Sequence, residues 1–170
     1  HFIWRDASPQ GLGIWYAKLA NNGATIVPSH LAVNGAGGTD GSGVPEIAIN
    51  KYQEVNIIWD ESPSGYTQMD YTKLDSLGNP LIPKIQVTPV NMFAYWPGIG
   101  VDSLVNNHLG YRTDSAGTSD RLTYSKLDKD GNILISNKIL GTGLGPTLIN
   151  DKNQNIHIVY DNPAGPGNSI

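Results

Sequence analysis

Apolar and polar residues alternate along much of this chain, and elsewhere apolar residues form short blocks bounded by glycine, proline, asparagine or aspartate. This pattern is typical of many short β-strands, because successive side chains of a strand point to opposite faces of its sheet. The three- to four-residue apolar spacing of an amphipathic helix is not evident in the sequence. The sequence therefore predicts an all-β fold.

One stretch of sequence recurs at a nearly constant spacing. Tyr124 opens Tyr-Ser-Lys-Leu-Asp-Lys-Asp-Gly-Asn, Tyr71 opens Tyr-Thr-Lys-Leu-Asp-Ser-Leu-Gly-Asn, and Tyr16 opens the more divergent Tyr-Ala-Lys-Leu-Ala-Asn-Asn-Gly. Consecutive tyrosines lie 55 and 53 residues apart, and a fixed period of this size indicates a repeat architecture. We expect one repeat domain over residues 1–170, with approximate repeats at 1–54, 55–106 and 107–155 and part of a fourth at 156–170.

Each repeat contains four predicted strands, of which the tyrosine strand is the third. The first strand opens with proline, whose missing N–H falls outside the ladder there, and we expect it at 45–50, 97–102 and 146–151. The second strand is expected at 1–4, 55–60, 107–111 and 156–161, and the fourth at 25–33, 81–90 and 133–140. Four antiparallel strands per repeat match a β-propeller blade, so we predict a propeller or a propeller fragment.

Within this architecture, the recurrent tryptophan, tyrosine, isoleucine and leucine residues are expected to fill the core between blades. The lysines that follow the repeated tyrosines, Lys18, Lys73 and Lys126, are expected to stay solvated.

The repeat motifs resemble the blades of sialidase-like (BNR-type) propellers. They are Pro-x-Ile-x-x-Asp at 97–102, Asn-x-His-Ile-Val-Tyr-Asp at 155–161 and the Tyr-x-Lys-Leu-Asp-x-x-Gly-Asn motif that begins at Tyr71 and Tyr124. Asp128-Lys-Asp-Gly-Asn132 occupies the place of that family's Asp-box, Ser-x-Asp-x-Gly-x-Thr-Trp, but lacks the following Thr-Trp. The resemblance extends over essentially the whole chain and implies a shared fold, not a shared catalytic site.

In this scheme the chain begins at the second strand of a blade and ends as it enters the third strand of another. One reading is a part of a larger propeller, which typically has about 4–8 blades. The other is a small closed ring in which the terminal strands complete the first blade. Because a half-blade exposes an unpaired edge, we favour the fragment, or self-association in which a neighbouring copy completes the terminal blades.

Composition excludes several classes of function. A net charge of -4 leaves no basic stripe for a nucleic-acid backbone, and no apolar run approaches the length of about 20 residues that a membrane helix needs. Cysteine is absent, which excludes disulfides, thiol catalysis and cysteine-ligated metals. The scarcity of lysine and the abundance of asparagine, glycine, serine and threonine favour an extracellular or cell-surface protein.

Charged residues follow the aromatic residue of the second strand in every repeat. The carboxylates are Asp6, Asp60 with Glu61, Asp114 and Asp161, and the arginines are Arg5 and Arg112. Propellers place the loops after the second and fourth strands on one face, which carries the ligand site, so these residues are candidate ligand contacts. The carboxylates could bind a cation or a polyol there, or each could cap its own turn by accepting backbone N–H groups.

An aromatic cluster follows the fourth strand of the second repeat, where we expect a loop on the same face. Phe93, Tyr95 and Trp96 lie together in the segment that runs from Asn91 to Trp96. Such rings could stack on sugars or anchor a protein partner, or they could pack between blades as a plug.

Three further patterns are expected to be structural. His1, His108 and His157 share one position of the second strand with Asn56, which favours a hydrogen bond between strands over a metal site. The segments 128–132 and 151–155 have the alternating oxygen side chains of calcium loops but lack the downstream bidentate glutamate, so we expect tight turns. The glycine-rich segment 34–43 lacks the Lys-Ser/Thr ending of a phosphate loop. We therefore assign no metal and no cofactor.

Catalysis has little support in these residues. The sialidase resemblance would imply an arginine cluster and a Tyr–Glu pair, whereas arginine occurs only at Arg5, Arg112 and Arg121. We assign no catalytic residue and predict a non-catalytic binding or structural module that recognises carbohydrate or a protein surface. One alternative is a sialidase-like glycoside hydrolase propeller with its catalytic residues outside this chain. Another is a structural repeat of a surface or filament protein.

Overall fold

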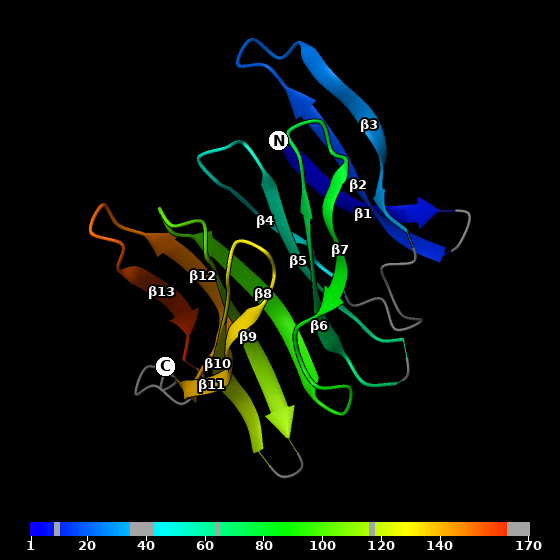
Figure 1. Ribbon diagram of the computed structural model, residues 1–170. Coiled ribbons are helices and arrows are strands. Elements are labelled where there is room, and N and C mark those ends of the chain that lie inside the picture. The colour runs from blue at the N-terminus through cyan, green and yellow to red at the C-terminus, as the bar shows by residue number, and fades with distance from the viewer. Residues whose placement is uncertain (9–10, 35–42, 64, 116–117, 163–170) are drawn as a thin grey trace, which may run out of the picture.

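The structure, a computed structural model, describes residues 1–8, 11–34, 43–63, 65–115 and 118–162. Thirteen strands and no helix lie in these ranges, so this part of the chain holds no helix that could cross a membrane. The strands form four antiparallel sheets that lie side by side in chain order (Figure 1). The final residues of the predicted fourth repeat, 163–170, and most of the glycine-rich segment, 35–42, lie outside the described residues.

The first sheet has three strands, in the order β1 (Phe2–Ser8), β2 (Gly11–Leu19) and β3 (Thr25–Val33). The second sheet has four, in the order β4 (Glu46–Ile49), β5 (Val55–Glu61), β6 (Gln68–Leu74) and β7 (Pro80–Gln86). The third sheet also has four, in the order β8 (Phe93–Val101), β9 (Asn107–Ser115), β10 (Thr118–Leu127) and β11 (Ile133–Thr142). The last sheet pairs β12 (Leu144–Asn150) with β13 (Ile156–Asp161).

This arrangement confirms the predicted all-β fold of repeated, propeller-type blades. Each predicted strand has its counterpart, and neighbouring strands in the chain pair with one another as the blade scheme requires. Several boundaries differ by up to four residues, and the strands expected at 1–4 and 107–111 continue to Ser8 and Ser115. The strand expected at 97–102 already begins at Phe93, and the strand expected at 81–90 ends at Gln86.

Two apolar clusters fill the spaces between consecutive sheets, because alternate residues of β5 point to opposite neighbours. Val55, Ile57 and Trp59 pack with Ile14 and Tyr16 of the first sheet. In the second cluster Ile58, Met69 and Tyr71 pack with Ala94, Ile99, Leu109, Tyr111 and Leu127 of the third sheet. Burial of each large side chain contributes about 1.5–3 kcal/mol. The predicted core between blades is thus confirmed.

The turns at one end of the blades share a five-residue geometry. In 128–132, the Oδ1 atom of Asp128 accepts the backbone N–H groups of Asp130 and Asn132, while its Oδ2 atom accepts the amide of Asn132. Asp75 and Asp151 accept the same set of bonds in their own turns. These bonds stabilise the charged carboxylates and hold the pKa of Asp151 at about 2. The predicted tight turns are confirmed.

The recurring position of the second strand makes the expected hydrogen bond between strands in three blades. The Tyr16 hydroxyl lies 2.9 Å from Nδ1 of His1, and the Tyr124 hydroxyl lies 2.7 Å from Nδ1 of His108. In the second sheet the Tyr71 hydroxyl donates to Oδ1 of Asn56 at 2.8 Å. Histidine and asparagine serve equally here because both offer an acceptor to the tyrosine.

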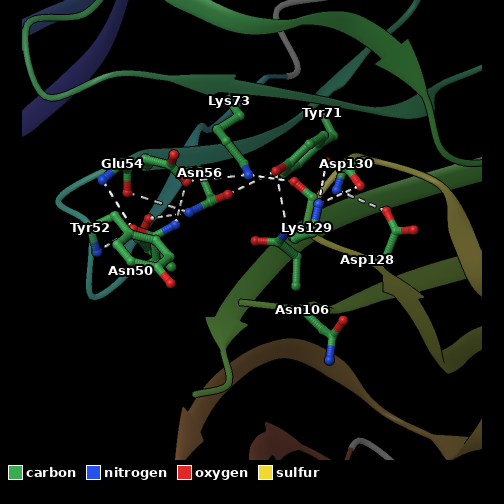
Figure 2. Close-up of polar contacts among 12 residues, drawn as sticks. Asn50, Tyr52, Glu54, Asn56, Tyr71, Lys73, Asn106, Asp128, Lys129 and Asp130 are labelled. Carbon is green, nitrogen blue, oxygen red and sulfur yellow. Dashed lines mark hydrogen bonds and ion pairs between the residues drawn. The ribbon is translucent and has the colours of Figure 1, made fainter. Parts of the chain in front are cut away.

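Lys73 departs from the prediction that the repeat lysines stay solvated. It is buried, and its ammonium donates to the backbone oxygen of Lys129 in the next blade and lies 3.3 Å from Glu54 (Figure 2). The turn of the following blade covers this position and supplies the carbonyl that keeps the charge bonded. Lys126, at the same position of the third sheet, keeps a side chain that is 25% exposed.

Candidate functional site

The connections from β5 to β6 and from β7 to β8 lie at the end of the blades opposite the five-residue turns. There, strand register brings several of the predicted contacts together in the third sheet. Tyr95 of β8 pairs with Arg112 of β9, and Phe93 pairs with Asp114 two residues further along. We call Phe93, Tyr95, Trp96, Arg112, Asp114 and Asp120 the Arg112 cluster.

Arg112 is the centre of this cluster. Its guanidinium carbon lies 5.4 Å from the centroid of the Tyr95 ring and 5.1 Å from that of the Trp96 ring, within cation–π range. The same guanidinium donates to both oxygens of Asp114, at 3.1 and 2.7 Å, and its Nε atom lies 3.0 Å from Asp120. These contacts fix the guanidinium in one orientation and hold both aromatic rings beside it.

Trp96 presents the most open aromatic surface of the cluster, with 45% of its area exposed. Its backbone has a φ of 54°, which is uncommon for a bulky residue and lies where the pairing of β8 with β9 shifts register between Tyr95 and Gly98. Gly98 is required next to this bulge, because a Cβ atom there would overlap the backbone of Pro146 in β12. The bulge therefore turns the Trp96 side chain away from the regular alternation of side chains along β8.

Aromatic contacts extend the cluster towards the second sheet. The Phe93 ring stacks on Tyr95 with centroids 6.3 Å apart, and its other neighbour is Tyr66 at 5.0 Å. Tyr66 comes from the connection between β5 and β6, and the sequence reasoning did not select it. Phe93, Tyr95 and Trp96 belong to the start of β8 instead of the expected loop, so their rings sit on a hydrogen-bonded strand.

The carboxylates and Arg5 are placed less uniformly than their sequence positions suggest. Oδ1 of Asp6 accepts the N–H of Ala7 at 2.7 Å, and Oδ1 of Asp60 accepts the N–H of Val44 at 3.1 Å. Asp114 accepts the N–H of Asp120 as well as the bonds from Arg112. Asp161 is exposed at the end of β13, and Arg5 lies against the backbone of Gly43. Asp6, Asp60 and Asp114 thus accept backbone N–H groups, which is the capping role that the sequence left open.

A second polar cluster lies at the same end of the second sheet. The sequence reasoning selected Glu61 as a candidate contact but not the residues that surround it. Glu61 and Asp70 are 2% and 0% exposed, and the ammonium of Lys84 contacts the Glu61 carboxylate and lies 3.9 Å from that of Asp70. Trp59 donates its indole N–H to Glu61 at 3.1 Å, and Gln68 donates to Asp70 at 3.2 Å. We call these five residues the Glu61–Asp70 cluster.

Lys84 is the ion-pair partner of both buried carboxylates in this cluster. Burial and the nearby Glu61 charge raise the pKa of Asp70 to about 7, and Oδ1 of Asp70 has no hydrogen-bond partner among the described residues. These observations fit a protonated Asp70 beside a charged Glu61. A signal for this cluster was present in the sequence, because Asp70 interrupts the apolar run between Met69 and Tyr71 in a predicted core strand.

No group of three or more histidine, aspartate or glutamate side chains in the described ranges could hold a metal ion. Comparison with known protein families and with curated proteins finds no match. Among solved structures, the chain is similar to the crystal structure of an endo-arabinase from Bacteroides thetaiotaomicron VPI-5482, with a TM-score of 0.53 and 12% sequence identity. The alignment covers 91% of this chain and 62% of that one, so the chain spans about three fifths of the enzyme's length. At this identity the likeness concerns the fold.

Proposed function

We propose that this chain is a non-catalytic carbohydrate-binding region of an exported β-propeller protein, and that the Arg112 cluster is its sugar-binding platform. The observation that carries the proposal is the exposed Trp96 ring held beside Arg112 and two carboxylates. A sugar presents apolar C–H faces and a rim of hydroxyl groups. An aromatic surface next to fixed acceptors and donors is complementary to both.

The charge balance of the cluster favours a neutral sugar. One guanidinium faces two carboxylates, which gives the group a net charge of -1. Because the Arg112 charge is already offset by its ion pairs with both acids, the excess negative charge of the cluster repels a substrate carboxylate. This argument also separates the site from one built for an acidic sugar such as sialic acid.

A glycoside hydrolase is the second candidate function, favoured by the likeness to an endo-arabinase. Hydrolysis by the usual route needs two carboxyl groups that reach the glycosidic bond. Glu61 and Asp70 form the buried pair of this face, and neither is exposed enough to touch a polysaccharide. Asp114 and Asp120 are both bonded to Arg112. The described residues therefore favour binding over catalysis. A protein ligand is less favoured than a sugar, because the platform is small and rich in polar groups.

Affinity electrophoresis through gels containing linear arabinan, xylan or polygalacturonate tests the proposal. We expect retardation in a neutral polysaccharide gel, loss of most of it in Trp96→Ala, and no retardation in polygalacturonate. Tyr52→Ala is the matched control, because Tyr52 is 64% exposed but belongs to a turn at the opposite end of the blade. Equal mobility of the wild-type protein in all gels would contradict the proposal. Release of reducing ends from arabinan would show the hydrolase instead.

A further inference from the structure

The connection between β5 and β6 is longer than its equivalents in the neighbouring sheets. It consists of residues 62–67, whereas residues 9–10 join β1 to β2 and residues 116–117 join β9 to β10. The added length carries Tyr66, whose side chain is 41% exposed and whose ring lies 5.0 Å from that of Phe93 in the next sheet. This connection departs from the repeat and brings an exposed ring to the Arg112 cluster, as loops that carry function do.

Hydrogen bonds hold this connection against the third sheet. The N–H of Ala94 in β8 donates to the backbone oxygen of Thr67 at 2.7 Å, next to both Tyr66 and Phe93. At the base of the connection, the buried hydroxyl groups of Ser62 and Thr67 lie 2.8 Å apart. The Tyr66 ring is therefore held in place before a ligand arrives, and preorganisation of this kind reduces the entropy that binding costs.

Four aromatic rings follow one another across the boundary between the second and third sheets, and we call them the aromatic row. Tyr66 contacts Phe93, and Phe93 stacks on Tyr95 with centroids 6.3 Å apart and planes at 7°. Arg112 bridges Tyr95 and Trp96, at 5.4 and 5.1 Å from their centroids. The inner rings are half-buried, whereas Trp96 at the far end is 45% exposed. Aromatic surface is thus open to solvent at both ends of the row.

Two separated stacking surfaces fit a ligand that presents several apolar faces in sequence, as a polysaccharide does. Each sugar ring of such a ligand offers one face to an aromatic ring, and the glycosidic bonds place the next sugar further along the row. Because the exposed rings are the ends of the row, a sugar chain can continue past Tyr66 and past Trp96. A site for a chain end would instead enclose the terminal sugar in a concave pocket.

The charged partners of the row lie at one of its ends, among the described residues. Asp114 and Asp120 are ion-paired with Arg112, which faces the Trp96 ring. Tyr66, at the other end, contributes a ring that rests on another ring. The Trp96 end can therefore bind sugar hydroxyl groups, and the Tyr66 end adds stacking area.

We propose that Tyr66 is a second sugar-stacking site, and that the aromatic row binds an internal segment of an extended neutral polysaccharide across the second and third sheets. This inference rests on the sugar-binding role proposed for the Arg112 cluster, and it adds the length of the ligand and the part of it that is bound. Tyr66 contributes affinity only when the sugar chain reaches from Trp96 to the neighbouring blade.

Calorimetric titration with linear arabinan and xylan oligosaccharides, from disaccharide to octasaccharide, tests the inference. We expect the affinity for one of these series to rise with length until the sugar chain spans the row, and to stay constant beyond that. Tyr66→Ala should weaken octasaccharide binding about fivefold, through loss of one stacking contact, and leave disaccharide binding unchanged. Trp96→Ala should weaken binding of both about tenfold.

Tyr66→Phe keeps the ring and should bind as the wild type does, which separates stacking from a change in the shape of the connection. Tyr52→Ala, at the opposite end of the blade, is the matched control. Light scattering with the long linear polymer gives the stoichiometry. We expect several protein molecules per polymer chain, because internal segments are many, whereas a site for a chain end would bind one.

The outcomes separate this inference from the function on which it rests. Equal affinity for disaccharide and octasaccharide, with Trp96→Ala still weakening both, would overturn the inference and leave the proposed function intact. One protein molecule per polymer chain would do the same, as would a Tyr66→Ala variant that weakens both oligosaccharides equally. Absence of binding at every length in both series would overturn the inference and the proposed function together.

Discussion

The two ends of the blades are built by different rules. At the turn end, the same five-residue geometry recurs with an aspartate that accepts its own backbone N–H groups, and each turn contacts the blade before it. At the opposite end, every blade differs. The third sheet has the Arg112 cluster, and the second has the Glu61–Asp70 cluster. Repetition at one end holds the blades in register, and this leaves the other end free to diversify.

The largest expected effect concerns the Glu61–Asp70 cluster. Folded Asp70 keeps its proton up to about pH 7, whereas in the unfolded chain it loses the proton near its ordinary pKa of 3.8. The stability that this group contributes is therefore complete below about pH 4, falls as the pH rises from 4 to 7, and changes little above that.

Asp70→Asn keeps a neutral group in this place and should flatten that decline. The variant should exceed the wild type in free energy of unfolding at pH 8 by on the order of 2–4 kcal/mol, with a smaller difference at pH 5. Urea unfolding at the two pH values measures this, with Asp161→Asn as an exposed control. An Asp70→Asn variant that is destabilised equally at both pH values would contradict a protonated Asp70 in the folded protein.

At the turn end, two glycines with the same backbone conformation offer a matched pair. Gly78 has a φ of 90° and lies against Tyr16 and His30, whereas Gly23 has a φ of 84° and open space around it. Gly23→Ala should cost about 1 kcal/mol from backbone strain alone. Gly78→Ala should cost about 2–4 kcal/mol, because overpacking against the first sheet is added. Equal losses in thermal or urea unfolding would mean that the turn does not support the blade contact.

At the end of the blades opposite the turns, Trp96→Ala should change binding more than stability. Trp96 is 45% exposed, so its removal should lower the free energy of unfolding by no more than about 1 kcal/mol, while sugar affinity falls about tenfold or more. Calorimetric titration with an arabinan oligosaccharide and urea unfolding of the same sample separate the two. A variant that loses both together would indicate a packing role, the plug that the sequence left open.

The smallest expected effect is on charge selectivity. Asp120→Asn removes one of the two carboxylates on Arg112 and makes the cluster neutral. Retardation in polygalacturonate gels should then rise by a few fold relative to wild type, with arabinan binding little changed. No gain with the acidic polymer would show that the charge balance does not select the ligand.

The repeat itself explains why the fold was predictable from this sequence. Tyr16, Tyr71 and Tyr124 recur with the same neighbours, so each copy corroborates the assignment of the others. Local chemistry also fixed the turns, since an aspartate followed by Gly-Asn satisfies its own backbone wherever it lies. Burial of Lys73 was missed because it depends on the turn of the next blade, which no local pattern encodes.

The site was predictable only in part, for the same reason. Tyr95, Trp96, Arg112 and Asp114 were selected from their place in the repeat, and strand register brings them together. Tyr66, Asp120 and Asp70 were not selected, and Glu61 was selected without its partners, because each acquires its partners from a different strand or connection. Side chains that have no equivalent in the other repeats carry no periodic signal.

The most direct test of the sugar-binding platform is to follow the four tryptophan indole N–H resonances while a neutral arabinan oligosaccharide is added. Trp96 lies on the platform, whereas Trp59 is buried and donates its indole N–H to Glu61. We predict that the Trp96 resonance shifts with saturation while the Trp59 resonance stays in place. A saturable shift confined to other tryptophans, or no shift at all, would contradict the assignment of the Arg112 cluster as the binding site.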